Sequence, residues 1–293
     1  MFIKKLSIKT LPVIGLFSLL SYLGLTGLLA KEIQRPNPNE FIITPQLSTI
    51  HQYQQNYLDN KARQILHFNS LDKNEEFMDD KSKKFIEENF QENGMIFESD
   101  VDILRYALAE AKNVKGGLYL HFGIKNGRSL NLEALLNPDE TIYAFDRLTG
   151  LPCKWREGFD KGTFAFKDPS KVLTQATPPN VVAYGGEFAE TLKEFFSSRN
   201  ESKISFIAMD VEVYESAKEV LTALTHYIRD RTILYLDEAI NYVDIDASGC
   251  WWNHEMKALW EWCHESGFNT RYRAYNRCHE QVVVQLEAKE SIK

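Results

Sequence analysis

The sequence predicts an α/β fold: a Rossmann-like, mostly parallel seven-stranded sheet with helices on both faces and an antiparallel C-terminal edge, preceded by an N-terminal apolar helix. From residue 99 onward, short apolar runs alternate with patterns of helical period. Such alternation is typical of parallel strands joined by helices that cover both sheet faces. The last two expected strands have no helix between them, so they should pair antiparallel at one edge of the sheet.

The expected strands cover residues 118–124, 141–146, 180–184, 204–210, 232–237, 270–276 and 281–286. Before the first of them, Ser99 with Asp102 three residues later predicts a capped helix that buries Leu104 and Leu108. Residues 99–293 are therefore expected to form the main domain.

An apolar segment precedes this domain. Lysines lie before residues 10–30, an uncharged stretch of about 20 residues that is long enough to cross a bilayer core. Leu28 stands where signal peptidase prefers a small residue, so residues 1–30 are expected to be an uncleaved single-pass anchor rather than a cleaved signal. Residues 31–98, rich in polar residues, are expected to be a linker and stem with short helices.

The charge bias across the anchor would keep the N-terminus in the cytoplasm and send the main domain across the membrane. Lys31 and Arg35 on the far side weaken this asymmetry, so the orientation stays open. Cleavage would instead give a secreted or lumenal protein.

Composition excludes one class of partner. The net charge of −7 would repel a phosphate backbone, so no nucleic-acid partner is expected. The four cysteines are too widely spaced for a CxxC motif and are expected to be free thiols. A homo-oligomer is compatible with the sequence, which does not identify the oligomeric state.

A glycine-bearing turn follows the first expected strand. Gly123 and Gly127 would let the backbone approach a cofactor closely, although doubly wound folds in general need small residues at this place. Asp146 ends the next expected strand, 23 residues after Gly123. An acidic side chain there can accept hydrogen bonds from both ribose hydroxyls of a nucleoside cofactor, and its alternative role is to cap the following loop.

Carboxylates follow two later strands. Asp210 ends one, and Asp237 with Glu238 ends the next. If these strands are neighbours, the three carboxylates meet in one crevice, where a hard cation such as Mg²⁺ would relieve their repulsion. The alternative is that some of them cap helices. His254 lies in a later loop with two tryptophans, where it either borders the substrate or caps a helix.

With these motifs in order, residues 116–286 resemble the macrocin O-methyltransferase family of class I S-adenosylmethionine-dependent methyltransferases. The resemblance rests on the segments Phe122-Gly-Ile-Lys-Asn-Gly-Arg-Ser129, Ala144-Phe-Asp146, Gly150-Leu-Pro152, Gly158-Phe-Asp-Lys-Gly162, Pro179-Asn-Val181, Gly186-Glu-Phe188, Thr191-Leu192, Met209-Asp210, Tyr214-Glu-Ser216 and Asp237-Glu238. The sequence departs from the family pattern at His121, Glu212 and Glu238, where other residues are common.

The resemblance implies roles for individual residues. Gly123, Gly127 and Ser129 would line the methionine end of S-adenosylmethionine, Asp146 would bind its ribose, and Glu187 with Phe188 would lie beside its adenine. Asp210, Asp237 and Glu238 would hold a divalent cation that binds hydroxyls of a sugar substrate.

The expected activity is therefore S-adenosylmethionine-dependent O-methylation of a sugar or another small molecule, assisted by Mg²⁺ or a similar cation, with Asp210 or His254 taking the proton. Two alternatives remain. A membrane-anchored glycosyltransferase would suit the anchor, stem and acidic residues, but such enzymes usually show Asp-x-Asp where this chain has Asp210-Val-Glu212. The second alternative is a non-catalytic relic of a methyltransferase, which would bind the cofactor without catalysing a reaction.

Overall fold

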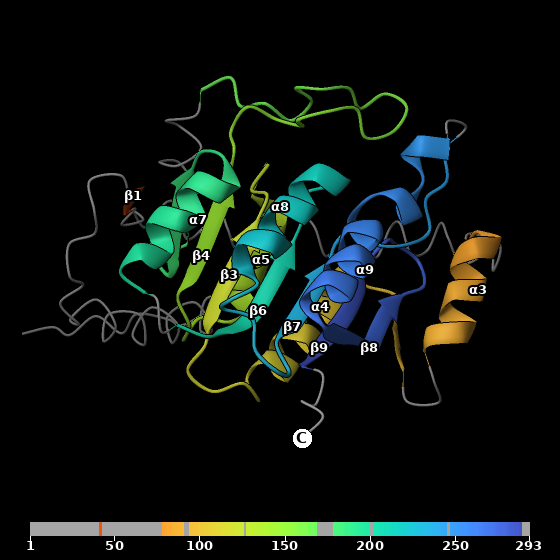
Figure 1. Ribbon diagram of the computed structural model, residues 1–293, viewed down its shortest axis with the longest axis horizontal. Helices are drawn as coiled ribbons and strands as arrows, with labels where there is room; N and C mark the ends of the chain where they lie inside the picture. Colours follow the sequence, from red (N-terminus) through yellow and green to blue (C-terminus); the bar gives the residue numbers. More distant parts are fainter. Residues whose placement is uncertain are drawn as a thin grey trace, which may run out of the picture. The chain divides into compact units, whose positions relative to one another are not determined.

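The computed structural model describes residues 41–42, 78–90, 94–125, 127–168, 178–199, 202–244 and 247–288 (Figure 1). The strands are β1 (Phe41–Ile42), β2 (Met95–Phe97), β3 (Leu118–Phe122), β4 (Ile142–Asp146), β5 (Val181–Gly185), β6 (Ile204–Met209), β7 (Ile233–Leu236), β8 (Phe268–Asn276) and β9 (Val282–Ala288). The helices are α3 (Asp80–Asn89), α4 (Asp100–Ala111), α5 (Arg128–Leu136), α7 (Phe188–Ser197), α8 (Tyr214–Leu224) and α9 (Glu255–Ser266), with short 3₁₀ turns η1 (Ala247–Gly249) and η2 (Trp251–Asn253).

Within these ranges the strands form one nine-stranded sheet in the order β1-β5-β4-β3-β6-β7-β9-β8-β2. All seven predicted strands are present, and β5, β4, β3, β6 and β7 run parallel, as predicted. β9 pairs antiparallel with both β7 and β8, which confirms the predicted C-terminal edge. The predicted number of strands was too small, because β1 and β2 extend the sheet at its two ends.

The strand order indicates where a ligand site is expected. Counted among the predicted strands only, the order is 3-2-1-4-5-7-6, and its first five follow the Rossmann order. The direction of the chain across the sheet reverses between β3 and β6, which are neighbours. Ligands of open α/β sheets bind outside the carboxyl ends of the strands at such a reversal. The ends of β3 and β6 are therefore where a site is expected.

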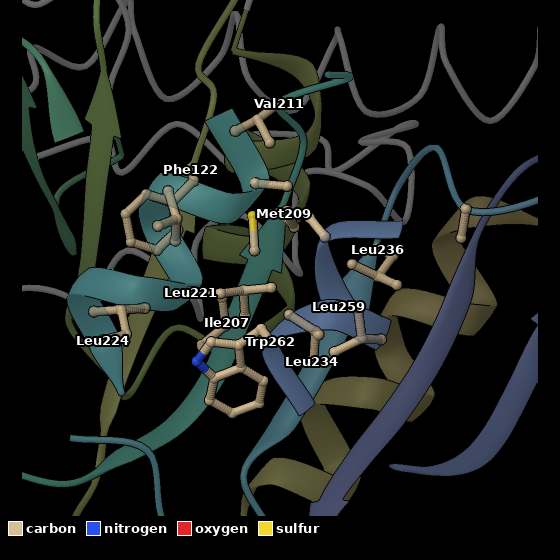
Figure 2. Packing of buried hydrophobic residues seen from close by; sticks show 14 of the residues in the cluster. Phe122, Ile207, Met209, Val211, Leu221, Leu224, Leu234, Leu236, Leu259 and Trp262 are labelled. Atoms are coloured by element: carbon tan, nitrogen blue, oxygen red, sulfur yellow. The ribbon is translucent and has the colours of Figure 1, made fainter. Parts of the chain in front are cut away.

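Two apolar clusters, one on each face, hold the sheet between its helices. Side chains of α7, α8 and α9 pack with β6 and β7 in one cluster, and side chains of α4 and α5 pack with β3 and β4 in the other. Figure 2 shows part of the first cluster, in which Ile207 and Met209 of β6 gather with Leu221 of α8 and Trp262 of α9. Helices thus cover both faces, as predicted.

The helix predicted before the first strand is α4, and Ser99 stands at its N-cap position. The Ser99 side chain makes no capping hydrogen bond, however, and Asp102 pairs with Arg105 at 2.5 Å instead. The start of the helix was therefore predicted correctly, but the capping box was not.

Part of the predicted stem belongs to this sheet and its core. β2 pairs parallel with β8, and Phe85 of α3 is buried in the first cluster. The predicted apolar helix and membrane segment, residues 10–30, lie outside the described residues and stay a prediction. Among the helices that the structure describes, none has the length and apolar character to span a membrane. No disulfide joins the four cysteines, all of which are described.

Candidate active site

The turn after β3 is built on glycine. Gly123 has a φ of +89°, and Gly127, which precedes α5, has a φ of +73°. A Cβ atom on Gly123 would overlap the backbone carbonyl oxygen of Asp210 at the end of β6. The Asp210 amide in turn donates to the Phe122 carbonyl at 2.9 Å. Glycine is thus required here for both conformation and space, and the turn lies directly against the strand end that carries Asp210.

Asp146, at the end of β4, fixes the same turn. Its Oδ2 accepts hydrogen bonds from the amides of Ile124 at 2.7 Å and Lys125 at 3.3 Å. Its Oδ1 accepts one from the amide of Leu148 at 2.6 Å. A carboxylate has about four acceptor positions, so Asp146 keeps capacity for a further donor such as a hydroxyl.

A cleft with about 400 Å³ of empty space, part of it open to solvent, lies at these strand ends. Its lining combines apolar and charged side chains: Gly123, Lys125, Asp146, Arg147, Gly150, Leu151, Pro152, Phe164, Phe188, Asp210, Val211, Glu212 and Ser216. The structure therefore brings Gly123, Asp146, Phe188 and Asp210 of the predicted site into one cleft.

Three other predicted residues lie beside this cleft. Gly127 is the N-cap residue of α5, and the Ser129 hydroxyl donates to Asp210 Oδ2 at 2.5 Å. Both carboxylate oxygens of Glu187 accept from the Arg147 guanidinium at 2.7 Å. Arg147 itself lines the cleft, so Glu187 reaches the site through its ion pair with Arg147.

The carboxylates predicted to bind a cation lie together. Asp210, Asp237 and Glu238 each offer an oxygen atom within 4.8 Å of the others. The Asp237 Oδ1 accepts from the Tyr235 hydroxyl at 3.0 Å and from the Gln281 amide at 3.1 Å. The Oε2 of Glu238 is buried and has no hydrogen-bond partner.

Two further acids, Glu212 and Glu255, are buried beside these three. Glu255, the first residue of α9, accepts from the amides of Val211 at 3.2 Å and Glu238 at 3.4 Å, so it joins the loops after β6 and β7. Glu212 has a φ of +62° and lies 3.9 Å from the Lys125 ammonium. Glu255 was not among the predicted site residues, because a glutamate in a first helical turn is common on exposed surfaces.

Burial and mutual repulsion shift the protonation of this cluster. Burial, together with the charge of Asp210, raises the pKa of Asp237 to about 7. Burial and the neighbouring carboxylates raise the pKa values of Glu238, Glu212 and Glu255 well above the usual range. A hard divalent cation binds such oxygen donors and offsets their charge, so the donor set and the unpartnered Glu238 oxygen fit Mg²⁺ or a similar ion.

His254, the second predicted proton acceptor, is not among the residues that line the cleft. Its ring stacks on Tyr242 with 6.4 Å between the centroids, and burial lowers the pKa of His254. A lowered pKa keeps the imidazole neutral, as a proton acceptor must be. The structure therefore supports the protonation state needed for this role without placing His254 at the cleft.

A buried histidine–glutamate pair contacts the glycine turn. His121 of β3 and Glu133 of α5 are almost fully excluded from solvent, and His121 Nδ1 lies 2.7 Å from Glu133 Oε2. His121 Nε2 lies 3.0 Å from the Gly123 carbonyl oxygen. The sequence showed His121 only as a departure from a family pattern, since a contact between a strand and the following helix has no signature in residue spacing.

Known proteins with a similar fold include the calicheamicin methyltransferase CalS11, with 18% identity over 87% of this chain and 99% of that chain at a TM-score of 0.48. The O-methyltransferase NovP has 16% identity over 64% of this chain and 79% of its own at a TM-score of 0.47. The mycinamycin-pathway methyltransferase MycE, in complex with Mg and SAH, has 13% identity over 66% of this chain and 55% of its own at a TM-score of 0.42.

No protein-family model and no curated protein sequence matches this chain. At the identities and TM-scores of the solved structures, the likeness does not establish what this chain binds. The resemblance to the macrocin O-methyltransferase family therefore stays a prediction from the sequence motifs, and the roles of the individual site residues stay predictions as well.

Proposed function

We propose that this chain is an S-adenosylmethionine-dependent O-methyltransferase assisted by a divalent cation. One observation carries the proposal: Asp210 both lines the cleft behind the glycine turn and belongs to the carboxylate cluster with Asp237 and Glu238. A cofactor in the cleft and a cation on the cluster would therefore be neighbours. A methyl donor and an acceptor hydroxyl need this arrangement for transfer.

The cleft has suitable groups for each part of the cofactor. Asp146 retains acceptor capacity for a ribose hydroxyl, and the buried ring of Phe188 offers an apolar surface to adenine. The acidic side chain of Asp210 favours a ligand with positive charge, such as a sulfonium with an ammonium group. Lys125 lines the same cleft and can face a ligand carboxylate.

The protein mainly has to align two reactants and accept a proton. When bound, S-adenosylmethionine supplies an electrophilic methyl group, and a divalent cation lowers the pKa of an acceptor hydroxyl. Asp210, Asp237 and Glu238 would hold the cation, and Asp210 or the neutral His254 would take the hydroxyl proton.

The acceptor class that we propose is a hydroxyl of a sugar or another small molecule. A cation held by a few carboxylates keeps open positions, which adjacent hydroxyl oxygens can occupy. The sugar preference comes from the sequence resemblance alone, and a screen of sugar and phenol acceptors would test it by product mass.

Calorimetric titration of the purified full-length chain with S-adenosylmethionine, with and without Mg²⁺, tests the cofactor. We expect saturable binding that Asp146→Ala abolishes and that the matched control Asp139→Ala, at an exposed turn, leaves intact. Absence of binding in both conditions would contradict the proposal. Binding of a nucleotide sugar instead would favour the glycosyltransferase alternative, and cofactor binding without turnover of any hydroxylated acceptor would favour a relic.

A further inference from the structure

The buried pair of His121 and Glu133 has a fixed direction of hydrogen bonding. A carbonyl oxygen only accepts, so His121 Nε2, at 3.0 Å from the Gly123 oxygen, must carry a proton and donate it there. The other ring nitrogen and Glu133 Oε2 share one proton across 2.7 Å. The pair thus connects α5 to β3 and at the same time holds the carbonyl group of the glycine turn.

Ser129 continues this set of contacts toward the cluster. Its hydroxyl lies 3.5 Å from His121 Nε2 and 2.5 Å from Asp210 Oδ2. Because Nε2 is already a donor, it cannot take the serine proton, so the hydroxyl donates to Asp210. Ser129, His121 and Glu133 have the residue types of a hydrolytic triad, but this hydrogen-bond direction excludes serine as a nucleophile.

Helical spacing explains how the pair controls Ser129. Ser129 and Glu133 are four residues apart on α5 and therefore lie on the same face of the helix, one turn from each other. His121 contacts both of them from the strand. Anchoring Glu133 on His121 therefore also sets where the Ser129 hydroxyl meets Asp210.

Stability alone does not account for this pair. Both side chains are taken out of water, and the second oxygen of Glu133, Oε1, is buried without a hydrogen-bond partner. Well-packed apolar residues of similar volume usually replace such a pair at no cost in stability, or with a gain. A role in positioning remains as the reason for a polar pair at this place.

We propose that His121 and Glu133 are positioning residues that set the Gly123 carbonyl and, through Ser129, the orientation of Asp210, so that one buried pair aligns the cofactor turn with the cation site. The inference rests on the proposed function and adds residues to it. Neither His121 nor Glu133 lines the cleft, so both would act through the turn and Ser129.

The test compares affinity with stability in the full-length chain. The double variant His121→Phe/Glu133→Leu replaces both polar groups by apolar ones, and we expect it to keep the wild-type melting temperature. We expect its affinity for Mg²⁺ alone, measured by calorimetry, to fall by about tenfold or more, as for other residues that orient metal ligands. Ser129→Ala should lower the Mg²⁺ affinity to a similar degree.

Glu133→Gln is the conservative control. Its amide can donate to Nδ1 of a neutral His121, so the contact survives without the charge, and we expect wild-type affinities for Mg²⁺ and S-adenosylmethionine. Wild-type Mg²⁺ affinity in the double variant or in Ser129→Ala would contradict the inference. So would a Glu133→Gln variant that bound Mg²⁺ about tenfold more weakly than the wild type. Either result would leave the proposed function standing. A wild-type chain that bound neither ligand would instead overturn the proposed function, and this inference with it.

Discussion

At the scale of single residues, the site depends on a close approach of two backbones. Gly123 combines a φ of +89° with a place where a Cβ atom would overlap the Asp210 carbonyl oxygen. The same contact sets the distance between the glycine turn and the carboxylate cluster. A side chain at this position would therefore disturb both the cofactor turn and the cation site.

Gly123→Ala is expected to lower the free energy of unfolding by about 3 kcal/mol or more, because a left-handed conformation and a steric overlap act together. Gly116 is a matched control, since its φ is +71° and a Cβ atom there would meet nothing within 4 Å. Gly116→Ala should cost only about 1–2 kcal/mol. Denaturant unfolding measures both values, and equal losses in the two variants would show that the close approach to Asp210 is not tight.

Asp237 makes stability depend on pH. Burial and the charge of Asp210 raise its pKa from 3.8 to about 7, so the folded chain binds this proton more tightly than the unfolded chain does. The resulting stabilisation is complete below the unfolded pKa and is lost as pH rises through the folded pKa.

In the presence of a metal chelator, the melting temperature of the wild type should therefore fall by several degrees between pH 5 and pH 8. A change of 1 kcal/mol in stability shifts the melting temperature by about 2–4 °C in a domain of this size. Asp237→Asn can keep the hydrogen bonds from Tyr235 and Gln281 but cannot ionise, so its melting temperature should fall less over the same range. Differential scanning calorimetry with and without Mg²⁺ gives the comparison. A wild-type melting temperature that rises from pH 5 to pH 8, while that of Asp237→Asn does not, would contradict the raised pKa of Asp237.

At the scale of secondary-structure elements, α3 shows that the polar segment before the main domain takes part in the core. The ring of Phe85 packs against aromatic side chains of η2 and β8, with centroid distances of 5.5 Å to Trp251 and 5.0 Å to Tyr272. Although α3 is far from α9 and β8 in the sequence, Phe85 contacts Trp260 of α9 and Tyr272 of β8. Figure 1 shows α3 at the β8 side of the sheet. The predicted boundary at residue 98 would separate these partners.

Phe85→Ala should lower the free energy of unfolding by about 3 kcal/mol, since it removes a buried aromatic ring from a packed cluster. The control Lys84→Ala, on the same helix with a side chain that is 73% exposed, should change stability by less than about 0.5 kcal/mol. Urea unfolding of the full chain provides the measurement. If both variants were as stable as the wild type, α3 would not be part of the cooperative unit.

Elements of the sheet differ in how far sequence could predict them. Six of the seven predicted strands are mainly apolar runs that the two clusters bury, and hydrophobic runs are visible in sequence. β8 is only partly buried. β2 has only three residues, of which Met95 and Ile96 are exposed, and β1 has two. Such short edge strands form through pairing with a neighbour rather than through burial of their own side chains, so no periodicity marks them.

At the scale of the whole molecule, the topology explains why the cluster could be predicted and its supports could not. Asp210, Asp237 and Glu238 follow adjacent parallel strands, so the sheet order alone brings them together. The positions of Glu133 and Glu255 depend on how α5 and α9 pack against the sheet, which the sequence does not specify. The structure therefore brings the predicted strand-end residues together, whereas the sequence did not indicate the residues that hold them in place.

The central claim is that a cofactor in the cleft and a cation on the cluster lie side by side, because Asp210 belongs to both. Proton relaxation of the S-methyl group of bound S-adenosylmethionine, with Mn²⁺ as the paramagnetic cation, tests this most directly. The account predicts strong broadening of the methyl resonance with Mn²⁺ in the wild type and its loss in Asp237→Asn/Glu238→Gln. A methyl resonance that stays sharp when both ligands are bound would contradict it.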